Sequence, residues 1–365
     1  MSARDIKEIL SKKKLSKQDL IYLLSLTEKE AKVLFNRALE VKLQNVGNTI
    51  HLRGLIEYSN VCEKNCLYCG LRISNPNKNL YTLTEEQINT CITNALHLRY
   101  GSVALQSGEQ SSPSFVSDIT QIIKKIKKLS DGKIGITLSC GEQSKETYRE
   151  WFDAGAHRYL LRIETSNENL YYKIHPKDKN HSFANRIECI DNLKEIGFQV
   201  GTGIMVGLPF QKTEDLAEDI LFFKQKNVAM VGLGPFIPHE DTPLWRYKEQ
   251  IPEDKERLFL TLKTLALVRI MMPKINMVSA TANQTLDKLG REKAVVVGAN
   301  VIMPNLTPTM NRKDYSIYPN KACVQDTPEE CANCLEIRMK SINHEILYDK
   351  WGDSPAFLEQ SKKTI

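Results

Sequence analysis

The chain has 365 residues, of which 41% are hydrophobic and 26% are charged, and its formal net charge is +6. A chain of this length can bury a large core, and one α/β barrel of about 250 residues with extensions would account for it. The sequence contains no run of ~18 apolar residues and no signal-peptide pattern, which excludes a membrane-spanning protein and favours a cytoplasmic location.

Lysines gather near the N-terminus, at positions 12, 13, 14 and 17. Such a cluster can attract nucleic acid or an acidic partner. The other lysines and arginines alternate with acids along helical faces, and the sequence contains no recognised nucleic-acid-binding module. We therefore interpret the basic cluster as a solvated face and expect neither a nucleic-acid partner nor a membrane partner.

Residues 1–48 are predicted to form a helical extension. Thr27 and Glu30 make a capping-box pair, and Ala31 and Leu34 follow at helical spacing. From about residue 50 the pattern changes, because short apolar runs begin to alternate with amphipathic segments.

Eight apolar runs of strand type follow. They cover residues 52–58, 102–106, 134–139, 158–164, 199–208, 230–237, 275–281 and 294–304. Helical patterns lie between them, near residues 84–95, 113–128, 144–154, 182–196, 213–226, 254–271 and 284–292. Near-continuous apolar strands that alternate with helices predict an α/β fold of the (β/α)8 TIM type over residues 49–305, followed by a C-terminal segment, residues 306–365.

Three cysteines follow the first predicted strand within eight residues, in the stretch NVCEKNCLYCG. They are Cys62, Cys66 and Cys69, and barrel enzymes place catalytic loops at this position. A 4Fe-4S cube takes four thiolates, so a cube held by three leaves one iron open to a small chelating ligand. Zinc is the alternative, although zinc motifs usually pair their cysteines as CxxC. Gly70 would let backbone pass close to the bound group.

The CxxxCxxC triad, with Tyr68 at its aromatic position, resembles the signature of the radical S-adenosylmethionine (SAM) superfamily. The wider chain is similar to the HydE family of FeFe-hydrogenase maturases. The resemblance spans most of the chain and rests on these stretches: EYSNVCEKNCLYCGLR, LQSGE, AGAHRYLLRIET, MVGLP, GLGPFIPHEDTPL and GANVIMPNLTP.

The resemblance implies a set of SAM-binding residues. Glu109 would accept a hydrogen bond from the SAM ammonium, and Arg162 and Arg186 would engage the carboxylate region. Glu164 would bind the ribose or ammonium; it alternates with Arg162 along one predicted strand, so both side chains should point into the barrel. The remaining members of the set are Tyr68, Gly203 and Gly207, although glycines within strands equally mark bends.

The resemblance also implies a substrate cavity beyond the SAM site. Thr281 stands where the family can carry paired threonines, but its neighbour is Ala280, which removes one anion-binding hydroxyl. Met303 can equally fill the core. The complete predicted lining is Gln106, Thr137, Arg158, Thr281, Met303 and Tyr315.

A second cysteine group, Cys323, Cys331 and Cys334, lies in the C-terminal segment. It resembles an accessory iron-sulfur site, 2Fe-2S or 4Fe-4S, that some members of the family carry. Zinc is again an alternative, with His344 as a further ligand. Of the other cysteines, Cys91, Cys189 and Cys140 are expected to be structural, although Cys140 could face the cavity.

The resemblance implies an enzyme that reductively cleaves SAM to a 5′-deoxyadenosyl radical. Its implied substrate is a cysteine-ligated Fe(CO)2(CN) complex used to assemble the hydrogenase cofactor. The implied partners are the other hydrogenase maturases and a low-potential electron donor such as flavodoxin or ferredoxin. The alternatives are a mutase or sulfur-insertion enzyme of the methylornithine synthase or biotin synthase type, and a non-catalytic iron-sulfur scaffold.

Overall fold

A computed structural model describes residues 3–362 of the chain. The strands and the connected helices alternate over most of its length, as the sequence predicts. The strands are β1 (Thr49–Leu52), β2 (Gly54–Ser59), β3 (Ser102–Ser107), β4 (Gly135–Ser139), β5 (Arg158–Leu160), β6 (Gln199–Thr202), β7 (Met205–Val206), β8 (Met230–Pro235), β9 (Asn276–Ser279), β10 (Val301–Ile302) and β11 (Glu345–Leu347).

Helices cover the outside of these strands. The α-helices are α1 (Ala3–Ser11), α2 (Lys17–Leu24), α3 (Glu28–Asn45), α4 (Glu85–His97), α5 (Pro113–Leu129), α6 (Lys145–Asp153), α7 (Glu168–Ile174), α8 (Phe183–Ile196), α9 (Thr213–Lys226), α10 (Asp254–Met271), α11 (Thr281–Leu286), α12 (Gly290–Val296), α13 (Thr309–Arg312), α14 (Pro328–Ser341) and α15 (Pro355–Ser361). Two 3-10 helices, η1 (Lys179–His181) and η2 (Pro243–Gln250), complete the set.

The strands form one parallel sheet that closes on itself. Its order is β11-β1-β10-β9-β8-β6-β5-β4-β3-β2, with β7 paired to β8. The bridge between Leu55 and Asn305 joins β2 to the chain after β10, and the Leu55 N–H donates to the Pro304 carbonyl at 2.7 Å. Because β1 with β2 and β6 with β7 each occupy one position, and β11 lies in the C-terminal segment, this is the (β/α)8 TIM-type arrangement that the sequence predicts.

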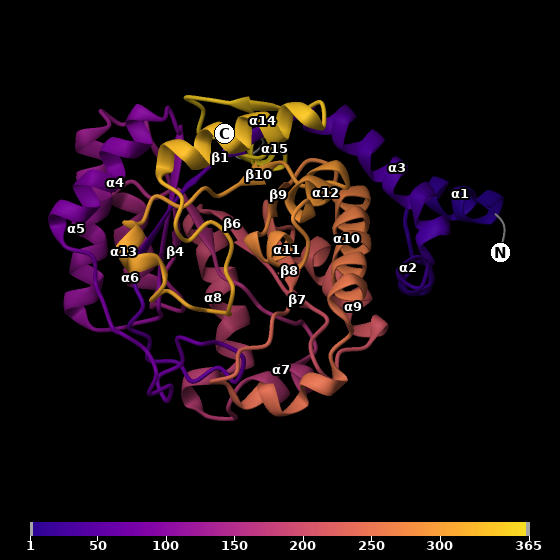
Figure 1. Ribbon diagram of the computed structural model, residues 1–365, viewed down its shortest axis with the longest axis horizontal. Coiled ribbons are helices and arrows are strands. Elements are labelled where there is room, and N and C mark those ends of the chain that lie inside the picture. The colour runs from indigo at the N-terminus through magenta and orange to yellow at the C-terminus, as the bar shows by residue number, and fades with distance from the viewer. Residues whose placement is uncertain (1–2, 363–365) are drawn as a thin grey trace.

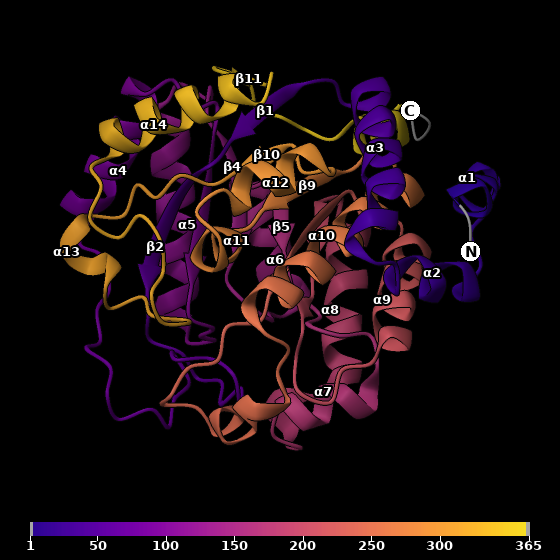
Figure 2. The ribbon, with the colours of Figure 1, turned by 45° about the vertical axis from the view of Figure 1, so that its right-hand side comes forward.

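The N-terminal helices and the C-terminal segment both pack against the barrel (Figure 1). α3 contacts α10, and α2 contacts α9. The C-terminal β11 adds to the outer edge of β1, beside α14. At the other end of the barrel, the long connection between β2 and α4 lies beside α7 (Figure 2), where the Leu67 N–H donates to the Ile174 carbonyl at 3.0 Å.

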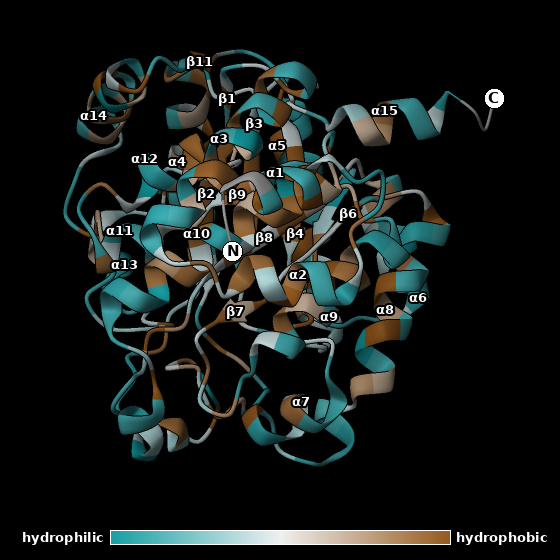
Figure 3. Ribbon diagram, turned by 90° about the vertical axis from the view of Figure 1, so that its right-hand side faces the viewer, coloured by the Kyte–Doolittle hydropathy of each residue, from teal (hydrophilic) through white to brown (hydrophobic). Residues whose placement is uncertain are grey.

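The barrel strands explain why their sequence runs are apolar on both faces. All six residues of β2 and of β8 are buried, because helices cover the outer face and side chains fill the inner one. Figure 3 shows the hydrophobic residues gathered on the central strands and the polar ones along the outer helices. Within residues 3–362, every helix is too short or too polar to span a bilayer.

Several predicted segments differ from the structure. The predicted strand 158–164 ends at Leu160, and the predicted strand 199–208 is the two short strands β6 and β7. Residues 294–304 were expected to be a strand, but the run begins as the end of α12 and pairs as a strand only at Val301–Ile302. The helix expected at 284–292 is two helices, α11 and α12. An apolar run of this length has the same pattern in a buried helix and a buried strand, so periodicity could not separate them.

The domain division at residues 48 and 305 stays a prediction. The structure shows that the C-terminal segment carries three helices and a strand that the sequence analysis left undescribed. The capping-box pattern at Thr327 and Glu330 marks the start of α14, and the Thr327 N–H donates to the Glu330 carboxylate at 2.8 Å. That local pattern was the available signal for this helix.

Candidate active site

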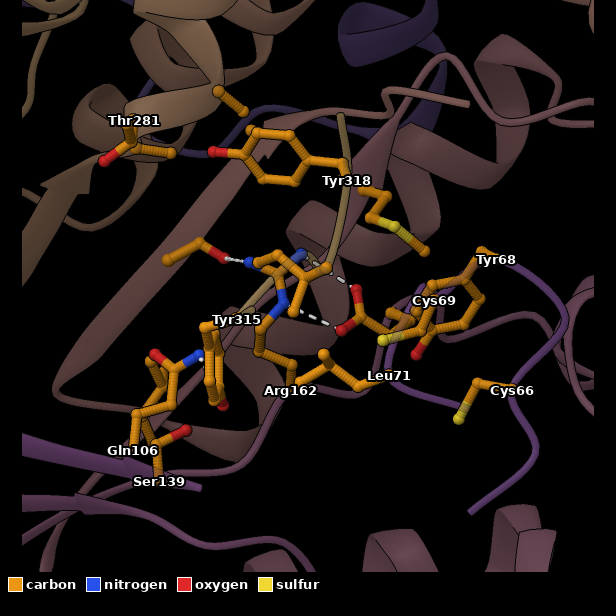
Figure 4. A pocket seen from close by; sticks show the side chains of 18 of the residues that line it. Cys66, Tyr68, Cys69, Leu71, Gln106, Ser139, Arg162, Thr281, Tyr315 and Tyr318 are labelled. Carbon is orange, nitrogen blue, oxygen red and sulfur yellow. Dashed lines mark hydrogen bonds and ion pairs between the residues drawn. The ribbon is translucent and has the colours of Figure 1, made fainter. Parts of the chain in front are cut away.

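The cysteine triad lies on the loop that follows β2, against a cavity of about 370 Å³. Cys62, Cys66 and Cys69 all line this cavity, and Figure 4 shows Cys66 and Cys69 on the same loop. Neighbouring segments hold the loop in place: the Glu63 N–H donates to the Glu109 carbonyl at 2.8 Å and the Asn65 N–H donates to His181 Nε2 at 2.9 Å. The fold therefore places all three predicted cysteines at the cavity.

The donor set fits an iron-sulfur cluster with one open iron. Burial raises the pKa of the Cys69 thiol to about 12 and raises that of Cys66 well above its usual value, so both thiols keep their protons until a metal displaces them. Of the cysteines in the described part of the chain, only these three line the cavity. Three thiolates on a 4Fe-4S cluster leave one iron for another ligand.

Gly70 follows the triad and lies against the C-terminal segment. A Cβ on Gly70 would lie 2.1 Å from the Ser316 carbonyl oxygen and 2.7 Å from the His239 ring. The Gly70 N–H also donates to the Ile317 carbonyl at 3.2 Å. This glycine therefore ties the triad loop to the C-terminal segment. The predicted approach of its backbone to the bound group stays a prediction.

Two acidic and two basic side chains form an ion-pair network beside the triad. Lys64 Nζ lies 3.0 Å from Glu109 Oε1 and 2.9 Å from Glu142 Oε2. Arg186 lies 3.5 Å from Glu109 Oε2 and 2.6 Å from Glu142 Oε1. Burial raises the pKa of Glu109, in spite of Arg186 and Lys64, whereas Glu109 and Glu142 outweigh the effect of burial on Arg186 and raise its pKa. The network holds two predicted SAM-binding residues in one place.

Arg162 and Glu164 form a second ion pair on the cavity wall. The Arg162 Nε and Nη2 groups donate to the two Glu164 oxygens at 2.8 Å each, and Nη1 donates to the Gly232 carbonyl at 2.7 Å (Figure 4). Glu164 has a φ of 65°, a left-handed conformation that is uncommon for residues other than glycine. The prediction that both residues alternate along one strand was wrong, because β5 ends at Leu160 and both lie on the connection that follows it. Both side chains nevertheless line the cavity.

The structure gives Gly203 and Gly207 packing reasons of their own. A Cβ on Gly203 would lie 1.8 Å from the Gly232 carbonyl oxygen, so this glycine allows two strands to approach. Gly207 has a φ of 82° and lies against the Arg257 side chain. Neither residue is among those that line the cavity, and their role in binding SAM stays a prediction.

Tyr68 lines the cavity between Cys66 and Cys69. Its hydroxyl lies 3.2 Å from His175 Nε2, and the two rings meet edge to face with centroids 5.2 Å apart. Burial raises the pKa of Tyr68 well above its usual value, so this side chain is a neutral phenol at physiological pH. The contact with His175 fixes the orientation of the ring within the triad loop.

The same cavity is lined by four of the residues predicted to bind substrate: Gln106, Thr281, Met303 and Tyr315. The Gln106 amide donates to the Tyr315 hydroxyl at 3.2 Å, and Arg291 Nη2 donates to Thr281 Oγ1 at 3.0 Å. Figure 4 shows Gln106 and Thr281 on the side of the pocket opposite Cys66.

The structure places Thr137 and Arg158 away from this lining. Arg158 begins β5, so it lies at the opposite strand end from the triad. Its Nε donates to Thr137 Oγ1 at 2.9 Å, and its Nη1 donates to Asp353 Oδ1 at 2.6 Å and to the Trp351 carbonyl at 2.9 Å. These contacts hold the C-terminal segment against the barrel.

The tail cysteines differ in exposure. Cys331 is buried, Cys323 is half-buried and Cys334 is exposed. His344, a proposed further ligand, instead lies with Nε2 at 2.8 Å from Lys42 Nζ. Within residues 3–362, no three or more His, Cys, Asp or Glu side chains converge in the geometry of a single-ion site.

The remaining cysteines are buried. Cys91 and Cys140 are fully buried and Cys189 nearly so. Cys140 Sγ lies 3.8 Å from the Leu105 carbonyl oxygen and is not among the residues that line the cavity.

Sequence reasoning missed four charged residues that line the site or pair within it: Lys64, Glu142, Glu57 and Lys321. Lys64 lies between Cys62 and Cys66 in the sequence, and a lysine at that place could have indicated an acidic partner near the triad. Glu57 interrupts the apolar run of β2, and a carboxylate inside a barrel strand requires a partner. Nothing in the sequence pairs it with Lys321, which is 264 residues away along the chain.

Comparisons with known proteins identify the family of this chain. Residues 56–223 match the model of the radical SAM superfamily. The chain is 43% identical over 337 residues to the FeFe-hydrogenase maturase subunit HydE of Thermotoga maritima, covering 92% of this chain and 93% of that protein. It is 27% identical to 3-methylornithine synthase of Methanosarcina acetivorans, over 79% of each chain.

Solved structures share the fold. A crystal structure of methylornithine synthase has a TM-score of 0.79 at 22% identity and covers 95% of this chain and 98% of its own. A crystal structure of HydG, a maturase of the FeFe-hydrogenase, has a TM-score of 0.79 at 19% identity and covers 99% of this chain and 81% of its own. At these identities the likeness shows the fold alone.

Membership of the superfamily implies a 4Fe-4S cluster and SAM, and the donor set on the triad loop fits that cluster. The identity to HydE extends over nearly the whole chain, well beyond the stretch that the superfamily model matches. The chain is a radical SAM enzyme, and within that superfamily it belongs to the HydE family.

Proposed function

We propose that the chain reductively cleaves SAM and uses the resulting radical in hydrogenase maturation. Cys62, Cys66 and Cys69 would hold three irons of a 4Fe-4S cluster and leave the fourth to the amino and carboxylate groups of SAM. When bound, the cluster supplies the electron that breaks the sulfonium carbon-sulfur bond, which gives methionine and a 5′-deoxyadenosyl radical. An external low-potential donor such as flavodoxin or ferredoxin would provide that electron.

The charged residues around the triad support a SAM site. Glu109 would accept from the SAM ammonium in place of Lys64, which lies 3.0 Å from it. Arg186 and Arg162 would bind the carboxylate region, and Glu164 the ribose or ammonium. Each of these charges already has a partner of opposite sign, which orients the side chains before SAM binds.

The substrate we propose is a cysteine-ligated Fe(CO)2(CN) complex, with the radical reacting at the cysteine sulfur. The observation that supports it is 43% identity over nearly the full length to a protein named as a hydrogenase maturase subunit. The other hydrogenase maturases would be its partners. The cavity of about 370 Å³ would hold the substrate beside the SAM site, so that the radical forms close to its target.

The tail cysteines belong to the same proposal as ligands of an accessory iron-sulfur cluster. Burial raises the pKa of Cys323 and of Cys331, and Arg291 opposes that effect at both thiols, so a cation lies where thiolates would form. Nine cysteines, all unpaired, fit the reducing cytoplasm that such clusters require.

The test is anaerobic reconstitution with iron and sulfide, followed by SAM and a low-potential reductant. We expect 5′-deoxyadenosine and methionine in equal amounts from the wild type and none from Cys66→Ala. Formation of 5′-deoxyadenosine by Cys66→Ala at the wild-type rate would contradict the assignment. Mass spectrometry of the product formed from the iron complex tests the substrate separately.

A further inference from the structure

A buried ion pair lines the cavity next to Gln106 and Tyr315. Lys321 Nζ contacts Glu57 Oε1, and both residues line the cavity. Glu57 is 1% exposed and Lys321 is 11% exposed. Neither residue belongs to the SAM-side networks of Arg162 and Arg186, so the pair requires a separate explanation.

The pair lies in a polar layer of the barrel. Glu57 of β2 is in register with Gln106 of β3, and Gln106 is in register with Ser139 of β4. All three line the cavity, so they point inward at the same height. The Lys321 ammonium lies 5.4 Å from the centre of the Tyr315 ring, which covers one side of it. The Glu57 carboxylate and the Lys321 ammonium therefore both face the cavity at the level of this polar layer.

Glu57 is held more firmly than its partner. The Asn305 amide donates to Glu57 Oε2 at 2.9 Å, and the Glu57 N–H donates to Thr307 Oγ1 at 2.9 Å. Among the described residues, Glu57 is the only hydrogen-bond acceptor that the Lys321 ammonium contacts. An ammonium carries three donors, so Lys321 retains capacity to bind a second acceptor in the cavity.

We propose that Glu57 and Lys321 bind the two charged ends of an α-amino-acid moiety in the substrate. The ligand's α-carboxylate would pair with Lys321 and its α-ammonium or amine would donate to Glu57. This inference rests on the proposed function, because the cysteine ligand of the proposed iron complex is such a moiety. It names the residues that recognise it.

Electrostatics favour this ligand over one with a single charge. A buried charge that loses its partner is costly, and a ligand with one charge would leave either Glu57 or Lys321 uncompensated. An amino acid brings one charge of each sign, so the four groups stay neutral as a set. Thr281 offers a further hydroxyl donor to the carboxylate, since its oxygen already accepts from Arg291 at 3.0 Å.

The geometry also gives the C-terminal segment a direct part in the site. Tyr315, Tyr318 and Lys321 all come from that segment and line the cavity. Cys323, a tail cysteine, follows Lys321 by two residues. The order of this segment therefore sets the position of the ammonium that faces the substrate.

The test uses calorimetry of the reconstituted, SAM-loaded protein with three probes. These are S-methyl-L-cysteine, its methyl ester, which lacks the carboxylate, and its N-acetyl derivative, which lacks the basic amine. We expect the wild type to bind each blocked probe roughly ten- to a hundredfold more weakly than the parent, because each loses one charged hydrogen bond.

Two variants assign the two ends. Lys321→Met should bind S-methyl-L-cysteine and its methyl ester with similar affinity, while Glu57→Gln should bind the parent and the N-acetyl probe with similar affinity. Lys313→Met is the matched control, because Lys313 is exposed on the same segment, and it should keep both wild-type preferences. If Lys321→Met lowers the thermal midpoint by several degrees, Lys321→Arg takes its place and should retain the preference for a free carboxylate.

Three outcomes would overturn the assignment. These are a wild type that binds none of the probes, a Lys321→Met variant that keeps the carboxylate preference, and a Glu57→Gln variant that keeps the amine preference. Formation of 5′-deoxyadenosine in the absence of substrate is measured in parallel. If the wild type forms no 5′-deoxyadenosine, the proposed SAM cleavage is contradicted. If it forms 5′-deoxyadenosine but shows one of the three outcomes above, only the assignment of Glu57 and Lys321 is contradicted.

Discussion

Lys64 shows how one side chain inside the triad links the loop to the rest of the site. It lies between Cys62 and Cys66 in the sequence, and its ammonium joins Glu109 and Glu142. The two glutamates would repel each other in a buried wall without a cation between them. The loop that carries the thiols is therefore held at its centre by charge and at its end by the packing of Gly70.

Gly70 supports a prediction at the same scale. We expect Gly70→Ala to cost about 1–3 kcal/mol, because its Cβ would meet the Ser316 backbone, and to lower the iron retained by the triad. Gly132→Ala is the control: it has a φ of 71° and nothing within 4 Å of its Cβ, so it should cost roughly 1 kcal/mol through backbone strain alone and retain its iron. Full iron content in Gly70→Ala, by colorimetric assay, would refute the close packing.

At the scale of elements, α14 carries two of the tail cysteines and starts with a capping box. The Glu330 N–H donates to Thr327 Oγ1 at 3.2 Å. Leu335 and Met339 bury one face of the helix, while Cys334 is on the exposed side. The cap fixes the residue at which the helix begins, and the apolar face fixes which side of the helix packs against the rest of the protein.

The capping contact predicts a local effect. Thr327→Ala should destabilise α14 by about 1 kcal/mol, which corresponds to about fivefold faster hydrogen exchange of its amides. Thr84→Ala removes the same kind of cap from α4, where the Gln87 N–H donates to Thr84 Oγ1 at 3.3 Å. That control should accelerate exchange in α4 and leave α14 unchanged. Equal exchange of α14 in Thr327→Ala and wild type would show that packing alone sets the helix.

At the scale of the whole molecule, residues 351–354 close the end of the barrel opposite the triad. Asn276 Nδ2 donates to the Gly352 carbonyl at 2.7 Å, and Arg158 pairs with Asp353 at 2.6 Å. Although burial opposes it, His157 and Arg158 hold the pKa of Asp353 well below its usual value. The C-terminal segment thus contacts both ends of the barrel, here and through Lys321 at the cavity.

Asp353→Asn tests this closure. Arg158 is fully buried, so removal of its carboxylate partner should cost about 3–5 kcal/mol in urea-induced unfolding. Asp349→Asn breaks the exposed pair with Arg99, whose side chain is 65% exposed, and should cost at most about 1 kcal/mol. Equal losses for the two variants would contradict a structural role for the buried pair.

The sequence by itself determined the parts of this protein that depend on local pattern. The alternation of strands and helices, the capping boxes at Thr27 and Thr84, and the spacing of the triad are all readable in windows of ten to twenty residues. The same local stretches carried the family resemblance. Where pattern is ambiguous, as in residues 294–304, the prediction was wrong, because a buried helix and a buried strand are equally apolar.

Only the tertiary structure decided which charges meet. Glu57 and Lys321, Lys64 and Glu142, and Arg158 and Asp353 are each far apart in sequence, and burial rather than spacing selects their partners. The tertiary structure also showed that Thr137 and Arg158 do not line the cavity. Arg158 begins β5, and the first residue of a parallel strand lies at the opposite end of the barrel from the last one. The physical reason is that an ion pair in a barrel wall depends on strand register and closure, which no local segment contains.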